Sequence, residues 1–236
     1  MEGLILAAGE GTRLFGSGLT GGCKPLVEVN GKRLLTYALD NLSAFGVRRA
    51  VIVVGKYAEE IKAVYGDHYR DIQLIYAQQE EPVGIVNAIL SAAPCVTDDI
   101  VLQLSDEIFV GLKPAQEPLC GGVDFAVGYV TEQDARKIRG NYSIDLDADG
   151  AVLKCTEKPT EVNNHYKGTG FCFFKRETLD TLRNFYDRAE NKPNDLCDFI
   201  NLLISKGKRG CIFETADAEI NINTEKDLQR ARTMIG

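Results

Sequence analysis

Two basic side chains in a glycine-rich stretch near the amino terminus could bind phosphate groups. Arg13 and Lys24 stand near the two ends of this stretch, Pro25 follows the lysine, and six glycines occur from Gly9 to Gly22. Because glycine has no side chain and tolerates positive φ, the backbone N–H groups of such a loop can approach an anion closely. Two cations held by the same loop suit a polyphosphate. The stretch therefore predicts a nucleotide site.

Two well-known phosphate-binding motifs do not describe this stretch. A P-loop requires the string GxxxxGK[ST], which does not occur. A dinucleotide-binding fingerprint requires a third glycine at the position of Leu14 and a helix directly after the strand. The further glycines and Pro25 predict that no helix begins there. A surface loop without a ligand is another alternative, but it leaves Arg13 and Lys24 without a role.

A carboxylate follows a predicted buried strand later in the chain. Asp106 comes directly after residues 101–105, which are largely apolar. In open α/β sheets, ligands bind at the carboxyl ends of the strands. Mg²⁺ is usually held by one or two carboxylates together with phosphate oxygens and water. Asp106 is therefore the first candidate for a magnesium ligand, and Glu107 is the nearest substitute. An aspartate that only caps a turn is the alternative.

The elements that would position these residues alternate along the first half of the chain. Short apolar runs predict strands, and apolar residues at helical spacing predict helices. Strands are predicted at 4–8, 50–54, 72–76 and 100–104, with a brief strand or turn at 27–29, and helices at 34–45, 58–65 and 84–93. This alternation indicates right-handed βαβ units and a sheet covered on both faces.

From about residue 113 the pattern changes to strands joined by polar turns. Strands are predicted at 123–130, 142–146, 152–157, 170–174 and 210–214, with a hairpin turn at 147–150, and helices at 177–188, 195–205 and 224–234. Thr224 is expected to cap the last helix. The length suits a single domain, 1–236, with two halves at 1–112 and 113–236. The predicted fold class is α/β, Rossmann-like, with a mixed, mostly parallel sheet flanked by helices and a small β-rich part.

The composition indicates which binding partners and which cellular compartment to expect for the protein. The net charge of −7 argues against nucleic acid or an anionic membrane as a partner. No run of residues has the length of a membrane helix, and a signal peptide is not recognisable. The seven cysteines are scattered, without CxxC pairs, as is typical of free thiols in a reducing cytoplasm. Lys24 could favour a thiolate at Cys23, although an incidental cysteine is the better interpretation. His68 and His165 lack partners at metal-ligand spacing.

The glycine-rich stretch carries a family resemblance. Leu6-Ala7-Ala8-Gly9-Glu10-Gly11-Thr12-Arg13-Leu14 and Lys24-Pro25-Leu26 resemble the signature of the sugar-phosphate nucleotidyltransferases, also called nucleoside-diphosphate-sugar pyrophosphorylases. The resemblance implies a GT-A-like nucleotidyltransferase fold with a nucleotide-binding first half and an acceptor-binding second half. It also implies Mg²⁺ as the cofactor and Arg13 and Lys24 as catalytic residues that contact the triphosphate. The implied nucleotide-binding residues of the motif are Leu6, Ala7, Ala8, Gly9, Gly11 and Thr12.

The same resemblance proposes the metal ligands. Ser105-Asp106 stands where the family has Gly-Asp after a strand, and the serine is bulkier than the glycine it replaces. Residues 219–228 resemble the family's later strand-to-helix turn, in which an Asp or Asn ligates the metal. Depending on the relative used for counting, Asn221 or Asn223 takes that place. A role for Asn223 as a neighbour of the helix cap is the alternative.

Two further motifs suggest how the substrates are recognised. Gln79, Pro82 and Gly84 match the family's QxxPxG segment, which recognises the base, and the amide of Gln79 could pair with a pyrimidine edge. Glu157-Lys158-Pro159 matches the family's EKP motif, which implies a carboxylate for sugar hydroxyls and a catalytic ammonium for the acceptor's phosphate; a surface turn is the alternative. The resemblance adds three residues to the acceptor pocket: Tyr142, Thr169 and Gly170.

These motifs predict a nucleotidyltransferase that couples a nucleoside triphosphate, preferably a pyrimidine, to a sugar 1-phosphate and releases pyrophosphate. The partners expected are therefore a nucleoside triphosphate and a phosphorylated small molecule, and the sequence leaves a homodimer open. A cytidylyltransferase for a phospho-alcohol or phosphonate, such as phosphocholine or an aminoalkylphosphonate, is the nearest alternative. More distant alternatives are a nucleotide-binding regulatory subunit without activity and a dehydrogenase, which would bind a nicotinamide cofactor.

Overall fold

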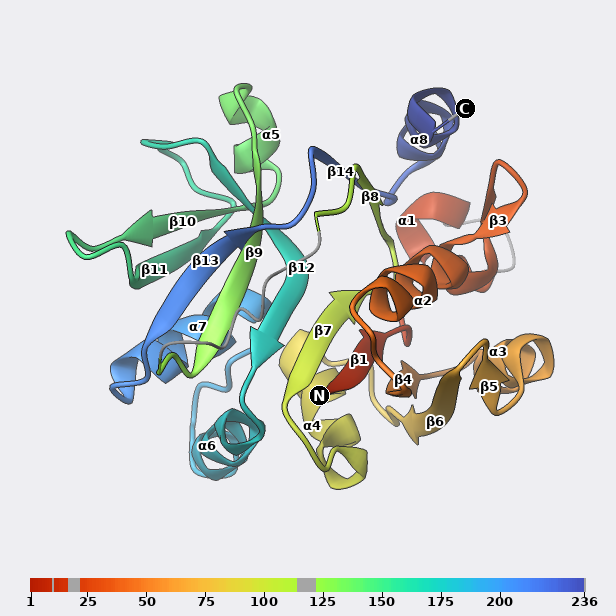
Figure 1. Cartoon of the computed structure of the whole chain (residues 1–236), viewed down its shortest axis with the longest axis horizontal. Coiled ribbons are helices and arrows are strands. Elements are labelled where there is room, and N and C mark those ends of the chain that lie inside the picture. Colours follow the sequence, from red (N-terminus) through yellow and green to blue (C-terminus); the bar gives the residue numbers. More distant parts are fainter. Residues whose placement is uncertain (10, 17–21, 114–121, 236) are drawn as a thin grey trace.

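Four parallel strands form one side of the main sheet (Figure 1). The structure, a computed structural model, describes residues 1–9, 11–16, 22–113 and 122–235; Glu10 and residues 17–21 of the glycine-rich stretch lie outside these ranges. The order of the parallel strands is β7-β1-β4-β6. Their bounds are Glu2–Leu6 for β1, Arg49–Val54 for β4, Ile72–Gln78 for β6 and Ile100–Leu104 for β7.

Strand β12 (Tyr166–Phe174) joins the two halves of the chain. It runs antiparallel to β7 through Cys172, Phe173 and Phe174 and also pairs with β9 and β10. One mixed ten-stranded sheet results. The remaining members are β5 (His68–Tyr69), β9 (Phe125–Thr131), β10 (Tyr142–Leu146), β11 (Val152–Glu157) and β13 (Gly210–Glu214). The predicted α/β fold class is confirmed. The division into halves at residue 112 stays a prediction.

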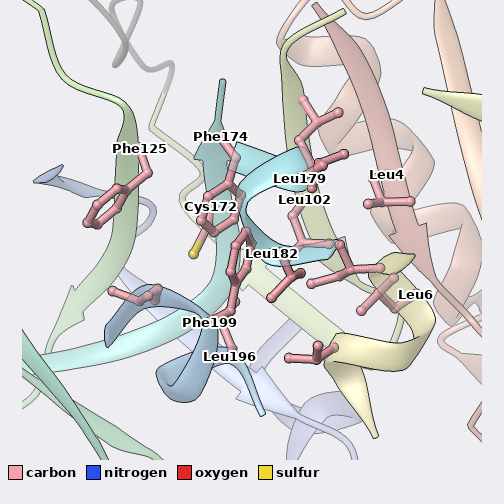
Figure 2. Close-up of a cluster of buried hydrophobic side chains, with 14 of the residues drawn as sticks. Leu4, Leu6, Leu102, Phe125, Cys172, Phe174, Leu179, Leu182, Leu196 and Phe199 are labelled. Atoms are coloured by element: carbon pink, nitrogen blue, oxygen red, sulfur yellow. The ribbon is translucent and has the colours of Figure 1, made fainter. Parts of the chain in front are cut away.

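Helices cover both faces of the sheet, because alternate side chains of each buried strand point to opposite faces. On one face pack α4 (Ile85–Ala92), α6 (Arg176–Tyr186) and α7 (Leu196–Ser205). Figure 2 shows this layer, in which Phe174 lies between the sheet and Phe199 of α7, with ring centroids 4.8 Å apart. Burial of each such side chain contributes roughly 1.5–3 kcal/mol relative to exposure.

The opposite face is covered by α2 (Leu34–Ala44) and α3 (Ala58–Tyr65). Leu35 and Leu39 of α2 are fully buried against the sheet, where Ile5 and Ile52 point to the same side. Both helices and all four parallel strands lie within a few residues of the predicted ranges. Among the described residues, no helix is both long and apolar enough to cross a membrane.

A small second sheet beside α8 (Glu225–Ile235) was not predicted. It consists of β8 (Glu107–Val110) and β14 (Ala218–Asn221), which are antiparallel. Ile108, Ile220 and Leu228 form its own buried cluster. Shorter elements include the hairpin of β2 (Glu28–Val29) and β3 (Lys32–Arg33), the helix α5 (Ala135–Arg139) and the 3₁₀ turn Ala93–Cys95.

The prediction that no helix begins after the first strand was wrong. Helix α1 (Thr12–Phe15) is a single turn. Gly11 precedes it with φ 64°, a left-handed conformation that costs glycine little, and the N–H groups of Leu14 and Phe15 donate to the Gly11 carbonyl. Gly16 ends the turn with φ 72°. The glycines therefore restrict the helix to one turn rather than prevent it.

Candidate active site

A pocket of about 340 Å³ opens at the carboxyl ends of β1 and β7. Most of the residues predicted for nucleotide and metal binding line it, whereas Ala7 and Asn221 do not. Ala7 is buried in the sheet layer under α2, and its N–H donates to the Val53 carbonyl. The lining residues are Leu6, Ala8, Gly9, Gly11, Thr12, Arg13, Lys24, Pro25, Gln79, Pro82, Gly84, Ile85, Ala88, Leu104, Ser105, Asp106 and Asn223.

Four polar side chains from distant parts of the chain meet in this pocket. Lys24 Nζ donates to Asp106 Oδ2 at 2.5 Å and to Asn223 Oδ1 at 3.2 Å. Arg13 also donates to Asn223 Oδ1, at 3.0 Å. The Lys24 side chain is 10% exposed and that of Asp106 is 24% exposed, so this ion pair is partly shielded from water. Two cations and one anion thus stand together and leave a net positive charge toward an incoming polyphosphate.

Local backbone geometry fixes the two cationic residues. Arg13 belongs to the single helical turn that Gly11 starts. Lys24 begins the 3₁₀ turn Lys24–Leu26, in which Pro25 occupies an early position and the Val27 N–H donates to the Lys24 carbonyl. Because proline fixes its own φ, the backbone beside Lys24 has little freedom. The lysine is consequently held with only 8% of its surface exposed.

The small sheet of β8 and β14 brings Asn223 next to Asp106. Asn221 pairs with Glu107 in the register of these strands, and the Ile222 N–H donates to the Asp106 carbonyl at 2.8 Å. Directly afterwards Thr224 caps α8, as predicted: its Oγ1 accepts from the Asp227 N–H, and Asp227 Oδ2 accepts from the Thr224 N–H. Asn223 is therefore held between a strand end and a capped helix.

The two candidate asparagines differ in their surroundings. Asn223 Oδ1 contacts both Lys24 and Arg13, whereas its Nδ2 donates to Asn221 Oδ1 at 2.6 Å. Asn223 and Asp106 therefore contact the same Lys24 ammonium, and Asn221 is joined to this group through Asn223. Asn221 orients the amide of Asn223, so that the oxygen of Asn223 points into the site.

The comparison with protein families agrees with this geometry. The model of the nucleotidyl transferase family matches residues 2–218. The chain belongs to this family. The resemblance predicted from the glycine-rich stretch and the Lys24-Pro25-Leu26 string is thereby confirmed, and the chain is an enzyme of the nucleotidyltransferase class.

The names of two similar proteins and of one structure with a similar fold specify different nucleotides. The UTP–glucose-1-phosphate uridylyltransferase AglF of Haloferax volcanii is 31% identical over 215 residues, which cover 88% of this chain and 85% of the relative. A glucose-1-phosphate thymidylyltransferase of Mycolicibacterium smegmatis is 32% identical over 200 residues, 81% of this chain and 67% of the relative. The structure of the inositol-1-phosphate CTP transferase from T. maritima superposes with a TM-score of 0.79 at 18% identity and covers 99% and 95% of the two chains.

The donor set in the pocket fits the Mg²⁺ that the nucleotidyl transferase resemblance implies. The carboxylate of Asp106 and the amide oxygen of Asn223 both contact Lys24 Nζ, so they converge on one cationic group. Among the described residues, no group of three or more His, Cys, Asp and Glu side chains is placed to hold a metal ion without other ligands. One carboxylate with one amide matches a magnesium site that substrate phosphates and water complete.

Glu107, the substitute considered for Asp106, has a different partner. Its two carboxylate oxygens accept from the Gly170 N–H at 3.0 and 2.8 Å, and the residue is 2% exposed. Burial, followed by the charges of Glu219 and Asp106, raises the pKa of Glu107 well above its usual range. The Gly170 N–H lies where the register of β12 against β9 shifts, so Glu107 satisfies a backbone donor that the sheet leaves free.

The predicted acceptor residues do not line the described pocket. Lys158 follows β11 with its side chain 69% exposed, and its Nζ pairs with Glu157 Oε1 at 2.8 Å. Its backbone adopts φ 44°, and its N–H donates to the Asn141 carbonyl. The structure therefore presents Glu157 and Lys158 as an exposed, paired set at a strand end.

Tyr142 and Thr169 are buried rather than exposed to a substrate. Tyr142 is 4% exposed, and its hydroxyl donates to the Thr169 carbonyl at 2.6 Å. The Thr169 side chain is fully buried beside Thr215. Together with the bond from the Gly170 N–H to Glu107, these contacts join β10, β12 and β8 in the interior.

Several contributors to the site were not predicted as site residues. Leu104, Ile85 and Ala88 line the pocket because they end β7 or begin α4. Asn87 accepts a hydrogen bond from Gln79. The sequence predicted the strand at 100–104 and the helix at 84–93 that carry these residues, so their positions at the end of a strand or the start of a helix could have indicated them. Lys167 and Glu219 form a buried ion pair near Asp106. The pattern of apolar residues in the sequence does not indicate that these two charged residues are buried together.

Cys23 has no activated thiol. Burial raises its pKa from 9.0 to about 11, and an added increase comes from the charge of Glu60. Lys24 points its ammonium to Asp106 and Asn223 instead of to the neighbouring sulfur. The interpretation of Cys23 as incidental is therefore the better one.

Proposed function

We propose that this nucleotidyltransferase joins a pyrimidine nucleoside triphosphate to a sugar 1-phosphate and forms a nucleoside-diphosphate sugar and pyrophosphate. The observation that carries the proposal is the meeting of Arg13, Lys24, Asp106 and Asn223 at the carboxyl end of β7. Two relatives above 30% identity bear names that specify glucose 1-phosphate. A phosphate oxygen of the acceptor attacks the α-phosphorus, the bond from the α-phosphorus to the bridging oxygen breaks, and pyrophosphate leaves.

Lys24 and Arg13 have the electrostatic role in this proposal. Little covalent chemistry is required of the protein in such a transfer, so positioning and charge neutralisation provide most of the catalysis. Lys24 is a compact point charge on a fixed turn, suited to an oxygen whose charge grows as the bond breaks. Arg13, with its planar guanidinium, offers several donors to the outer phosphates.

Asp106 and Asn223 would hold Mg²⁺, which would polarise the phosphoryl oxygens and offset their charge. In the structure these two side chains instead contact Lys24. With Mg²⁺ bound, Asp106 would still have a cationic partner, and the Lys24 ammonium would be available to a phosphate oxygen. Asn221 is proposed to position the Asn223 amide.

The remaining site residues are assigned to the base and the acceptor. Gln79, Pro82 and Gly84, which line the pocket, are proposed to bind the base, and Leu6, Ala8, Gly9, Gly11 and Thr12, which line it too, are proposed to bind the rest of the nucleotide. Glu157 and Lys158 are proposed to bind the sugar hydroxyls and the acceptor's phosphate. Tyr142, Thr169 and Gly170 are proposed to support that surface from behind, because their polar groups are occupied within the protein.

A matrix of triphosphates against acceptors tests the proposal. UTP, dTTP, CTP, ATP and GTP would each be incubated with Mg²⁺ and glucose 1-phosphate, other hexose 1-phosphates, phosphocholine or an aminoalkylphosphonate, and pyrophosphate release measured. We expect turnover with a sugar 1-phosphate and a pyrimidine triphosphate. Turnover confined to CTP with phosphocholine or the phosphonate would replace the proposal by a cytidylyltransferase for those acceptors.

A further inference from the structure

We propose that the buried ion pair of Lys167 and Glu219 fixes the position of β14, and through it the two asparagines of the proposed metal site. The inference rests on the proposed function, because the asparagines matter to the reaction only if they serve the metal and the triphosphate. The Lys167 ammonium donates to Glu219 Oε2, and the two side chains are 9% and 0% exposed. Neither residue lines the described pocket, so both are positioning residues.

Net stabilisation does not account for this ion pair. Removing two charges from water is costly, and replacing a buried ion pair by apolar side chains of similar volume is often neutral or stabilising. The cost is only partly recovered here, because no donor among the described residues reaches the buried Glu219 Oε1. A buried ion pair can instead specify how two strands meet, since each charge is stable only beside its partner. The pair therefore favours one arrangement of its two strands over the neighbouring ones.

The lysine belongs to a strand that is paired on both sides. Lys167 of β12 is in register with Val130 of β9 and with Ser143 of β10. Lys167 could shift along the sheet only if the hydrogen bonds to both neighbouring strands were broken. Its ammonium is therefore a fixed point of the main sheet, relative to which the small sheet of β8 and β14 is placed.

The glutamate belongs to a strand whose apolar pattern allows more than one register. Among the described residues, β8 and β14 pair with each other and with no strand of the main sheet. After Glu219, residues 220–223 repeat isoleucine and asparagine twice, and Ile220 and Ile222 are both buried. Because the side chains of a strand alternate with a period of two, a shift by two residues would again bury an isoleucine and present an asparagine. Apolar burial alone does not select the register that brings Asn223 to the site.

Glu219 distinguishes the observed register from its neighbours. A shift by two residues would bring Asp217 or Asn221 opposite Lys167 instead. An asparagine side chain is uncharged, and an aspartate is one methylene shorter, so neither makes the contact that Glu219 makes. The ion pair therefore selects one register. It is the register in which Asn223 contacts both cations of the pocket.

Two single variants separate the length of the Glu219 side chain from its charge. Glu219→Gln keeps the length and an oxygen that accepts from Lys167, so the Mg²⁺ concentration for half-maximal rate should stay close to that of the wild type. Glu219→Asp keeps the charge but is shorter, so this concentration should rise about tenfold, as is typical when a residue that orients metal ligands is lost. A rise in Glu219→Gln as large as that in Glu219→Asp, or no rise in Glu219→Asp, would overturn the inference.

An apolar replacement separates positioning from stability. Lys167→Met combined with Glu219→Met removes both charges, so the urea midpoint of unfolding should equal or exceed that of the wild type. The Mg²⁺ concentration for half-maximal rate should nevertheless rise as in Glu219→Asp. Lys208→Met is the matched control, since Lys208 pairs with Asp124 at the opposite end of β9, and it should leave this concentration unchanged. An unchanged Mg²⁺ dependence in the double variant, whatever its midpoint, would assign the pair a structural role only and overturn the inference.

Two measurements without turnover separate this inference from the proposed function. Hydrogen–deuterium exchange of the Ile222 amide, which donates to the Asp106 carbonyl, reports the register of β14. Mn²⁺ binding with UTP and no acceptor, followed by electron paramagnetic resonance, reports the metal site. Faster exchange and weaker Mn²⁺ binding in Glu219→Asp, but not in Glu219→Gln, support the inference even when the acceptor matrix contradicts the sugar 1-phosphate. Exchange at Ile222 as slow in Glu219→Asp as in the wild type overturns it, even when sugar 1-phosphates are turned over.

Discussion

The Lys24 ammonium lies 2.5 Å from a carboxylate oxygen of Asp106, although the two residues are 82 positions apart in the sequence. The pair joins the glycine-rich stretch to the end of β7 across the mouth of the pocket. Removing one partner of a shielded pair leaves the other charge without compensation. Under the proposed function, the triphosphate would replace Asp106 as the partner of Lys24, and a divalent cation would replace Lys24 as the partner of Asp106.

Lys24→Ala should lower kcat by about 10²–10³-fold, because one charge-assisted contact to the transition state is lost. Arg13 and the loop amides still bind the nucleotide, so its affinity should fall much less. Lys154→Ala removes an exposed lysine of β11 and serves as the charge-matched control. Wild-type kcat in Lys24→Ala, on the preferred substrate pair, would remove Lys24 from the catalytic residues.

Asp106→Asn should weaken the use of divalent cations more than Asn223→Ala or Asn221→Ala, since the carboxylate supplies the negative charge. Among the asparagines, Asn223→Ala should have the larger effect, because only Asn223 contacts the same cationic group as Asp106. The measurement is the dependence of initial rate on Mg²⁺, together with Mn²⁺ binding followed by electron paramagnetic resonance. An unchanged metal curve for Asp106→Asn would exclude this ligand.

The parts of the fold that the sequence could predict are those decided locally. Apolar runs with sharp polar boundaries gave the bounds of β7, β10, β11 and β13 and of α3 as the structure has them. The hairpin between β10 and β11 has Gly150 at φ 80°, which its turn residues had indicated. Local sequence is enough to predict these bounds, because the buried and exposed residues of each segment follow the spacing typical of a strand or a helix.

What the sequence could not predict depends on long-range pairing. Strands β8 and β14 have four residues each, and within the described ranges each pairs only with the other, about a hundred residues away. Their pairing places Asn223, rather than Asn221, in contact with the Lys24 ammonium that Asp106 also contacts. The register shift of β12 near Gly170 likewise decides that Glu107 and Tyr142 bond to the backbone of β12. A motif match identifies a candidate residue in the sequence, but it does not predict the direction in which the side chain points.

The Cys23 thiol should be slow to react at neutral pH. Its pKa of about 11 keeps it protonated at pH 8, and its thiolate fraction should rise about tenfold for each pH unit until pH 11. Alkylation by iodoacetamide, followed by mass spectrometry of the peptide, measures the rate, and Cys23→Ser identifies the signal. If the alkylation rate at pH 8 equalled that of a free cysteine, the prediction that burial raises the pKa of Cys23 would be wrong.

Tyr142→Phe tests whether this tyrosine supports the fold or contacts the acceptor. The change removes the hydrogen bond to the buried Thr169 carbonyl and should lower the free energy of unfolding by about 1–2 kcal/mol. Because the hydroxyl already has a partner inside the protein, KM for the acceptor should stay within about twofold. Denaturation by urea and steady-state kinetics measure the two quantities. An unchanged stability with a raised KM would place the hydroxyl at the substrate instead.

Lys158 should bind the acceptor and not the nucleotide. It lies at the end of β11, outside the pocket that Arg13 and Lys24 line, and its exposed ammonium is paired only with the neighbouring Glu157 among its described contacts. An ammonium there would offset the repulsion between the two phosphate-bearing substrates as they approach. Lys158→Ala should therefore raise KM for the acceptor and lower kcat, while the affinity for the triphosphate alone stays within a few-fold of the wild type.

The conservative variant sharpens this prediction. Lys158→Arg keeps the charge but has a longer, planar head group, so it should recover only part of the lost activity. Glu157→Gln removes the partner without removing the ammonium and should affect the acceptor's KM through the sugar hydroxyls. Calorimetry of triphosphate binding to Lys158→Ala decides between the two halves of the site. If that affinity collapses while acceptor binding survives, Lys158 serves the nucleotide, and the surface at the end of β11 is not the acceptor's.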